Sequence, residues 1–242
     1  MIKKCLNSYQ IKIIALILML IDHIGGVLIE SGILNFSEFW GRDALFWFNL
    51  DYALRFIGRI SFPLFCYFIV EGFLHTKNIK KYLCRILIFA FISEIPFDLA
   101  FHNSFFYLGY QNVLFEFALA VLMLWALSKN NGEIVKQGVI IFIFCILSYY
   151  LRLDYDYIGI LLIAIFYLFR NDKSMMFLLS GVLLMYSSKS FFCISVFSLL
   201  IINMYNGLKG KLNIKYLFYL FYPIHLTLLV FIRIYILGIF IN

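Results

Sequence analysis

Residues 11–29 read IKIIALILMLIDHIGGVLI, an apolar run that carries Asp22 and His23 beyond its middle. A helix that crosses a bilayer needs about 20 mostly apolar residues, and the run shows no strand-like alternation of polar and apolar residues. Lysines followed by an apolar stretch can also mark a secretory signal, but no small-residue cleavage site follows here, so we interpret the run as a retained helix. It predicts a membrane protein with a polar pair inside its first helix.

The composition of the whole chain agrees with this interpretation. Hydrophobic residues make up 64% of the 242 residues and charged residues only 14%, against roughly 45–50% and 25% in soluble domains. So few charges cannot cover a water-facing surface, which excludes a soluble globular protein and a disordered chain. The five cysteines show no metal-ligand spacing, so we expect reduced thiols that pack as small apolar groups.

Further apolar runs predict, with the first, about nine transmembrane helices, within a range of about eight to ten. Lysine and arginine are concentrated in alternate loops, and the positive-inside rule then places the N-terminus in the cytoplasm. The predicted fold class is an all-α, polytopic membrane helical bundle that forms one domain over residues 1–242. The further runs are 52–75, 82–101, 113–127, 138–150, 157–169, 175–186, 191–205 and 216–240.

Ionisable residues inside the predicted helices fall at similar depths when the helical rise is counted from the nearest cytoplasmic charge. Such residues are costly in a membrane unless they face one another or a wet cavity. The three prolines, Pro63, Pro96 and Pro223, lie beside this layer, so we expect kinked helices around a central polar cavity. The layer comprises Asp22, His23, Glu94, Asp98, Glu116, Asp156 and His225, with Arg55, Arg59 and Asn112 nearer its outer edge.

Helical spacing predicts which of these groups interact. Asp22 and His23 are neighbours in the chain and point about 100° apart, so Asp22 is not expected to orient His23 directly. We expect Asp22 to pair with Arg59, and a carboxylate on another helix, such as Glu94, to orient His23.

On the cytoplasmic side, Glu71 and His75 are four residues apart and precede a group of basic residues. The group either sets the topology or binds a phosphate-bearing molecule, since lysine and arginine neutralise phosphates. Its members are Lys77, Lys80, Lys81 and Arg85.

Several short motifs, in this order, extend from about Lys12 to Leu226: DHIG (22–25), GRISFP (58–63), EGFLHT (71–76), SEIPFD (93–98) and FYPIH (221–225). The set resembles the TraX family of bacterial membrane proteins, named after a conjugal-transfer protein linked to N-terminal acetylation of F-type pilin. More distantly, it resembles multi-span acyltransferases that move an acyl group across the membrane.

The resemblance implies an acyl-CoA-dependent N- or O-acetyltransferase in the bacterial inner (plasma) membrane. Acetyl-CoA would be the donor co-substrate, and the acceptor would be an extracytoplasmic amine or hydroxyl on a pilin-like peptide or a surface glycan. The expected partners are the lipid bilayer, acyl-CoA and this acceptor, with no nucleic acid and no metal.

Residue roles follow from combining the resemblance with the predicted polar layer. A midplane histidine would act as general base, because its pKa lies near neutrality; the catalytic candidates are His23 as the base, Glu94, His225, Arg59 and Asp22. Donor phosphates would bind cationic side chains, and the cofactor-binding candidates are Lys77, Lys80, Arg85, His75 and Glu71. The acceptor would meet polar groups near the outer face, and the candidates are Asp98, Asn112, Glu116 and Asp156.

A proton-coupled transporter of a small solute is the alternative, because carboxylate–histidine layers in membranes also serve as proton relays. The sequence shows no inverted repeat of the kind that many transporters contain. A noncatalytic scaffold would leave the shared polar layer unexplained.

Overall fold

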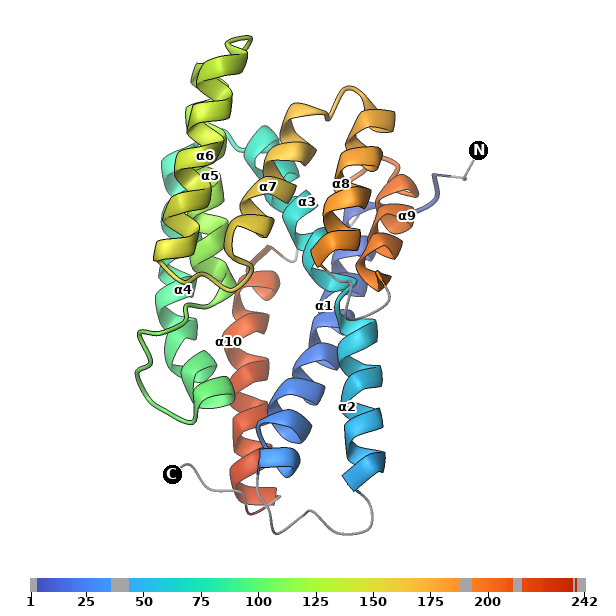
Figure 1. Ribbon diagram of the computed structural model, residues 1–242, viewed down its shortest axis with the longest axis vertical. Helices are drawn as coiled ribbons and strands as arrows, with labels where there is room; N and C mark the ends of the chain where they lie inside the picture. The colour runs from blue at the N-terminus through green and yellow to red at the C-terminus, as the bar shows by residue number, and fades with distance from the viewer. Residues whose placement is uncertain (1–3, 36–43, 188–192, 211–214, 237, 239–242) are drawn as a thin grey trace. The chain divides into compact units, whose positions relative to one another are not determined.

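The computed structural model describes residues 4–35, 44–187, 193–210, 215–236 and 238 (Figure 1). Most of these residues are helical and none lies in a β-strand, so the predicted all-α membrane bundle is confirmed. The helices are α1 (Ser8–His23), the π-helix η1 (Ile24–Glu30), the 3-10 helix η2 (Ile33–Asn35), α2 (Ala44–Gly58), α3 (Ser61–His75), α4 (Ile79–His102), α5 (Val113–Lys129), α6 (Ile134–Tyr150), α7 (Asp156–Leu168), α8 (Lys173–Ser187), the 3-10 helix η5 (Ile194–Val196), α9 (Phe197–Asn203), α10 (Lys215–Phe231) and the π-helix η6 (Ile232–Ile236).

Each predicted transmembrane segment coincides with a helix, although one of them is divided. The run 52–75 contains the end of α2 and all of α3, and α2 begins at Ala44 rather than at Tyr52. The apolar sequence before Asp51 continues the helix, because Asp51 lies in a cluster with Arg55 and is not an isolated charge. The predicted ends at residues 191 and 240 lie outside the described residues.

Three helical stretches in the described part of the chain are long and apolar enough to cross a membrane: Ser8–Asn35, Ala44–His75 and Phe218–Tyr235. Four further apolar helices are shorter: Ile134–Tyr150, Asp156–Leu168, Lys173–Ser187 and Ile194–Asn203. Large apolar side chains such as Phe142, Leu178 and Leu228 are exposed, as expected for a surface that faces lipid. The count of about nine spans stays a prediction.

The three prolines differ in their helical positions. Pro63 lies in the first turn of α3, where its missing N–H is not needed for a helical hydrogen bond. Pro96 and Pro223 lie inside α4 and α10. Only these two remove a hydrogen bond from a helix interior, so the expected kinks apply to α4 and α10.

Two compact units share the chain; three of their boundaries fall inside α3, α4 and α9, and the fourth, between Tyr107 and Leu108, falls in the loop between α4 and α5. The first unit comprises Met1–Phe62, Ile92–Tyr107 and Leu200–Asn242, and the second comprises Pro63–Phe91 and Leu108–Leu199. Whether both form one domain, as predicted, stays a prediction.

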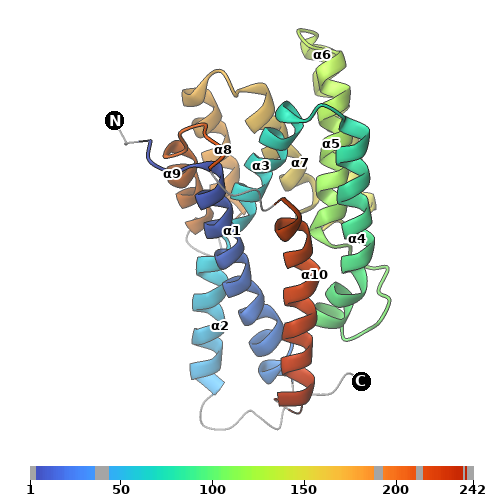
Figure 2. The same ribbon diagram turned by 180° about the vertical axis from the view of Figure 1, so that it is seen from behind.

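In the first unit, α1 packs between α2 and α10 (Figure 1; Figure 2). Asn7 begins α1 with a capping box, since its side chain accepts from Gln10 N–H while the Gln10 side chain accepts from Asn7 N–H. α2 comes very close to α1 at Gly58, where an added Cβ would lie 2.2 Å from Cβ of Asp22. Glycine therefore sets the spacing that brings the polar groups of the two helices together.

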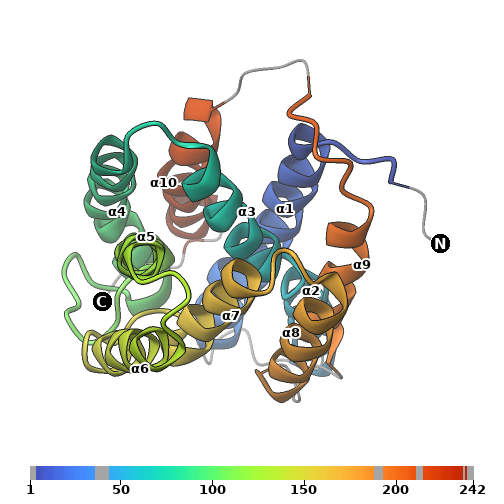
Figure 3. The same ribbon diagram turned by 90° about the horizontal axis from the view of Figure 1, so that it is seen from above.

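In the second unit, α5 and α6 pack together, α7 contacts both, and α8 packs on α7 (Figure 3). The core of this unit comes from α5 and α7, with Val121, Leu124, Leu162 and Ile163 fully buried. α6 leaves most of its apolar side chains exposed. The sequence of α6 is apolar all round, which suits a helix with lipid on one side and protein on the other.

Arg233, on η6, is a charged residue buried inside the first unit, with 1% of its surface exposed. Its guanidinium donates to the backbone carbonyls of Leu99 (2.6 Å) and Ala100 (2.8 Å) near the end of α4. Carbonyls in the last turn of a helix lack helical partners and carry partial negative charge, so a cation there is stabilising. Arg233 thus links the end of the chain to α4.

We expect Arg233→Met to lower the stability of the detergent-purified protein by about 2 kcal/mol, because two charge-assisted hydrogen bonds are lost. The measurement is the temperature at which the monodisperse peak disappears in size-exclusion chromatography. Arg152→Met, which removes an exposed arginine, is the matched control and should leave that temperature unchanged. An Arg233→Met protein as stable as the wild type would contradict this role.

Candidate functional site

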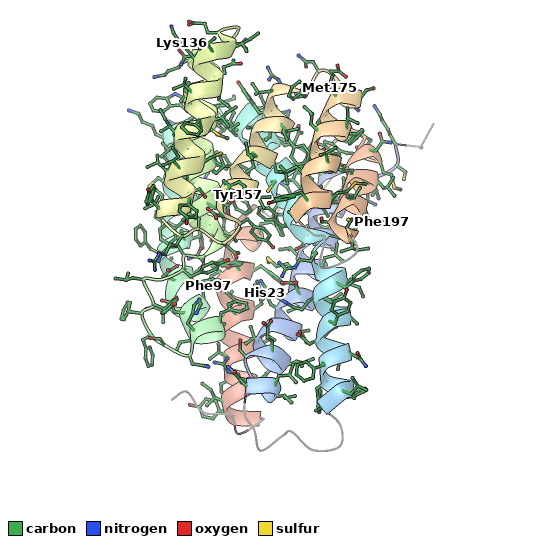
Figure 4. All side chains as sticks on the ribbon, viewed as in Figure 1. His23, Phe97, Lys136, Tyr157, Met175 and Phe197 are labelled. Atoms are coloured by element: carbon green, nitrogen blue, oxygen red, sulfur yellow. The ribbon has the colours of Figure 1, made fainter. Side chains whose placement is uncertain are left out.

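The two membrane-buried histidines of the predicted layer meet in the first unit. Nδ1 of His23, at the end of α1, lies 2.6 Å from Nε2 of His225 on α10, and the His23 side chain is marked in Figure 4. Nδ1 of His225 lies 2.6 Å from the backbone carbonyl oxygen of Phe221, one turn earlier on the same helix. The result is a chain of two hydrogen bonds that ends at a backbone carbonyl.

The two imidazole rings meet edge to edge. Their planes differ by 10° and their centroids are 4.9 Å apart. Parallel rings stacked face to face cannot bring two nitrogens within 2.6 Å of each other, so the rings must lie nearly in one plane. The shared proton then lies close to the line between the nitrogens, which is the strongest hydrogen-bond geometry.

Aromatic rings surround this pair within the first unit. Phe101 and Tyr222 present T-shaped contacts to His23, at centroid distances of 5.5 and 5.9 Å, and Phe221 stacks on His225 at 4.8 Å. His225 is buried, whereas His23 is partly exposed. Of the two, His23 is the one that a reacting molecule could contact.

An ion cluster lies next to the histidine pair. Nη1 of Arg55 donates to the Asp22 carboxylate at 2.6 Å, and Nε of Arg55 lies 3.6 Å from the Glu30 carboxylate. Asp51 belongs to the same electrostatic cluster. The expected partner of Asp22 was Arg59, but the structure pairs Asp22 with Arg55, one helical turn earlier.

Two glycines after His23 make room for this cluster. A Cβ on Gly25 would lie 3.1 Å from Oδ1 of Asp51, and one on Gly26 would lie 3.0 Å from Nη1 of Arg55 and 2.9 Å from the Phe101 ring. These glycines belong to η1, and π-helical turns occur often at functional sites. The Asp-His-Ile-Gly-Gly sequence therefore combines the polar pair with the space that its partners need.

Glu94 and Arg59 are both half-buried in the first unit. Glu94 was expected to orient His23, and the side chain that meets Nδ1 of His23 is that of His225. Roles for Glu94 and Arg59 in catalysis stay predictions.

The basic group lies in the second unit, at the end of α3 and the start of α4. Lys77 and Lys80 are exposed and Arg85 is partly buried. Nε of Arg85 is buried without a hydrogen-bond partner among the described residues. Nδ1 of His75 lies 2.8 Å from the carbonyl oxygen of Glu71 on its own helix, so that nitrogen already has a hydrogen-bond partner.

Two of the expected acceptor-binding residues have clear structural contacts. Asp98, in the first unit, accepts a hydrogen bond from Tyr107 N–H at 2.8 Å. Asn112 begins α5 by accepting from Leu114 N–H, and its amide donates to the carbonyl of Ala90. Both side chains are buried, and their predicted part in substrate binding is untested.

The other two expected residues, Glu116 and Asp156, lie around the α6–α7 loop of the second unit. Glu116 is fully buried and accepts from Tyr155 N–H at 2.8 Å, and the Asp156 carbonyl accepts from the Ser148 hydroxyl. Tyr110, in the loop between α4 and α5, donates to Asp154 of the α6–α7 loop; burial and then the Asp154 carboxylate raise the pKa of the Tyr110 hydroxyl, so it remains a donor. Substrate binding by Glu116 and Asp156 stays a prediction, as does the central cavity.

Arg55, Asp51 and Glu30 are the members of the site that the sequence reasoning left out of its catalytic candidates. Arg55 is four residues after Asp51, a spacing that places both on one helical face. An acid–base pair at that spacing inside an apolar helix is the signal that could have identified them.

Comparisons with known proteins agree with the residue pattern. A family model described as "TraX protein" matches residues 7–233. The chain is also 32% identical over 247 aligned residues to the "Probable fimbrial assembly protein FimC, serogroup H1" of Dichelobacter nodosus, and the alignment covers 92% of this chain and 94% of that relative. No solved structure matches.

Proposed function

The chain belongs to the TraX family, and on that premise we propose that it is a membrane-embedded acetyltransferase of the bacterial inner membrane. It moves an acetyl group from cytosolic acetyl-CoA to an amine or hydroxyl outside the cytoplasm, on a pilin-type N-terminus or a surface glycan. The observation that carries the proposal is the hydrogen-bonded histidine pair, with His225 buried and His23 partly exposed. The relative named as a fimbrial assembly protein supports the pilin-type acceptor.

At the carbonyl carbon the reaction makes one bond and breaks one, and one proton moves from the acceptor to the leaving group. The acceptor nitrogen or oxygen forms a bond to the carbonyl carbon of the thioester, and the carbon–sulfur bond breaks. The proton that the acceptor loses moves to the imidazole of His23 and then to the sulfur of the departing CoA. His23 thus acts first as a general base and then as a general acid, and ends in its starting form.

The ion cluster suits this chemistry because its member next to His23 in the chain, Asp22, is paired with a cation. Asp22 neutralises Arg55, so the field at His23 is not that of an isolated charge. The aromatic rings around His23 limit the access of water, which would otherwise compete with the acceptor for the acetyl group. Arg59 is proposed to stabilise the oxyanion, and Glu94 to balance the charge that develops.

The basic group of the second unit is proposed to hold the phosphates of CoA. Lys77 and Lys80 offer exposed ammonium groups, and the Nε–H of Arg85, unpartnered among the described residues, is a further donor. Lysine and arginine are the side chains that bind phosphate most often. Glu71 and His75 at the end of α3 are proposed to support this group.

We expect the Lys80→Ala/Arg85→Ala double variant to bind acetyl-CoA and CoA about tenfold more weakly than the wild type, because charge-assisted contacts to phosphate are lost. The measurement is calorimetry on detergent-purified protein. Lys129→Ala/Lys136→Ala is the matched control: it removes the same charge from the side predicted to be cytoplasmic and should leave the affinity unchanged.

Folded wild-type protein that binds neither ligand would contradict the acetyltransferase. Proton flux driven by a substrate in liposomes without acyl-CoA would then favour the transporter. Equal weakening in both double variants would show that only overall charge matters, and would remove Lys80 and Arg85 from the binding group.

A further inference from the structure

The hydrogen bonds around His225 determine which of its nitrogens carries the proton. Nδ1 of His225 lies 2.6 Å from the backbone carbonyl oxygen of Phe221. A carbonyl oxygen can only accept, so Nδ1 of His225 must be the N–H that donates. The backbone of α10 therefore selects the tautomer of its own histidine.

The tautomer of His225 in turn determines the tautomer of His23. A neutral imidazole has one N–H, so Nε2 of His225 presents a lone pair. Nδ1 of His23 lies 2.6 Å from that atom in a nearly coplanar arrangement, and one of the two nitrogens must supply the proton. It is Nδ1 of His23, which leaves Nε2 of His23 without a hydrogen.

We propose that His225 is a positioning residue that holds His23 in the tautomer protonated at Nδ1, so that Nε2 of His23 is the atom that takes the acceptor's proton. This inference rests on the proposed acetyltransferase function for its catalytic meaning. The tautomer follows from the contacts of His225 with Phe221 and His23 alone.

Burial keeps His225 in this role. It is 4% exposed, with the Phe221 ring stacked on it and the Tyr222 ring at its edge. A second proton on His225 would place a charge among these rings, which is costly. It would also put a donor on Nε2 of His225, so that Nδ1 of His23 would have to accept. His23 would then carry its own proton on Nε2, and Nε2 of His23 could no longer act as a base.

The arrangement also supports the charged form of His23 during the reaction. When Nε2 of His23 takes a proton, its Nδ1–H becomes a charge-assisted donor to His225, and such bonds are stronger than neutral ones. The Phe221 carbonyl accepts from Nδ1 of His225, and this makes Nε2 of His225 a stronger acceptor for the Nδ1–H of His23. A backbone carbonyl and a neutral imidazole thus do what a carboxylate does in a serine–histidine–aspartate triad.

The direct test is nitrogen-15 NMR of protein labelled in its four histidines, with the His23 signals identified from their loss in His23→Gln. We expect a protonated Nδ1 and an unprotonated Nε2 for His23, with a coupling across the hydrogen bond to Nε2 of His225. A wild-type spectrum in which His23 carries its proton on Nε2 overturns the inference.

Two variants at position 225 separate positioning from packing. His225→Phe keeps a ring but removes the acceptor, and should lower kcat on the order of 10²-fold with little change in KM. His225→Gln offers an amide oxygen to the His23 N–H, and should recover about tenfold of that loss. The fraction of His23 that is protonated at Nδ1 should fall in His225→Phe and recover in His225→Gln, as the activity does.

Failure of this inference and failure of the proposed function give different results. Acetyl transfer by the wild type with the proton of His23 on Nε2, or with a fully active His225→Phe variant, overturns the positioning role alone. The expected tautomer in a protein that transfers no acetyl group supports the tautomer and overturns the acetyltransferase.

Discussion

Acetyl transfer is expected to be lost when His23 is replaced by alanine, with a fall in rate on the order of 10²- to 10⁴-fold, the range that a positioned general base contributes. His23 is the partly exposed member of the histidine pair, and the geometry offers no substitute for it. His225 is buried, and its Nδ1 is already bonded to the Phe221 carbonyl.

The measurement is transfer of labelled acetyl from acetyl-CoA to a peptide with a pilin-type N-terminus, in proteoliposomes and per mole of monodisperse protein. Loss of the His23 N–H leaves Nε2 of His225 without its donor, so we also expect about 1 kcal/mol of destabilisation, too little to prevent folding. His102→Gln, a histidine variant outside the pair, is the control and should retain activity. A fully active His23→Ala protein would remove His23 from the mechanism.

The second large effect is expected from Gly58→Ala, which should destabilise the protein by about 3 kcal/mol or more and abolish transfer. The added Cβ would lie 2.2 Å from Cβ and 2.7 Å from Cα of Asp22. Because Cα belongs to the backbone, no rotation of a side chain can relieve the contact, and α1 must move away from α2. The Asp22–Arg55 ion pair, now 2.6 Å long, would open in a membrane interior, where an unpaired charge is costly.

Folded yield and thermal stability in detergent measure this effect. Gly138→Ala is the matched control, because Gly138 lies within α6 and its added Cβ meets nothing within 4 Å. Alanine favours a helix over glycine by about 1 kcal/mol, so the control should be as stable as the wild type or more so. Equal behaviour of both variants would show that the close approach at Gly58 is not needed.

Much of the fold could be predicted because it depends on local composition. Runs such as 113–127 and 157–169 are helical within a few residues of their predicted ends, since in lipid a backbone must satisfy its own hydrogen bonds and an apolar run has no other solution. The prediction was wrong at the start of α2, because the apolar run was begun at residue 52 and the helix begins at Ala44. The Asp51 carboxylate just before that run has Arg55 one turn away, and its charge does not interrupt the helix.

The candidate site was predicted less completely. Depth along each helix placed His23 and His225 at a similar level, and the structure brings them into contact across 202 residues of sequence. Depth cannot say which way a side chain points around its helix. For that reason Asp22 was assigned to Arg59 although Arg55 binds it, and the direct contact between His23 and His225 was not predicted.

The amino-acid sequence alone was enough to establish the membrane class, the helical fold, the family resemblance and the two histidines that meet in the first unit, because these depend on hydrophobicity and short motifs. The partners of those polar residues depended on the packing of α1 against α2 and α10. The packing against α2 rests on Gly58, Gly25 and Gly26, where side chains are absent and helices approach closely. A difference of one helical turn in register changes the partner of Asp22, and only contacts between segments distant in the chain select that register.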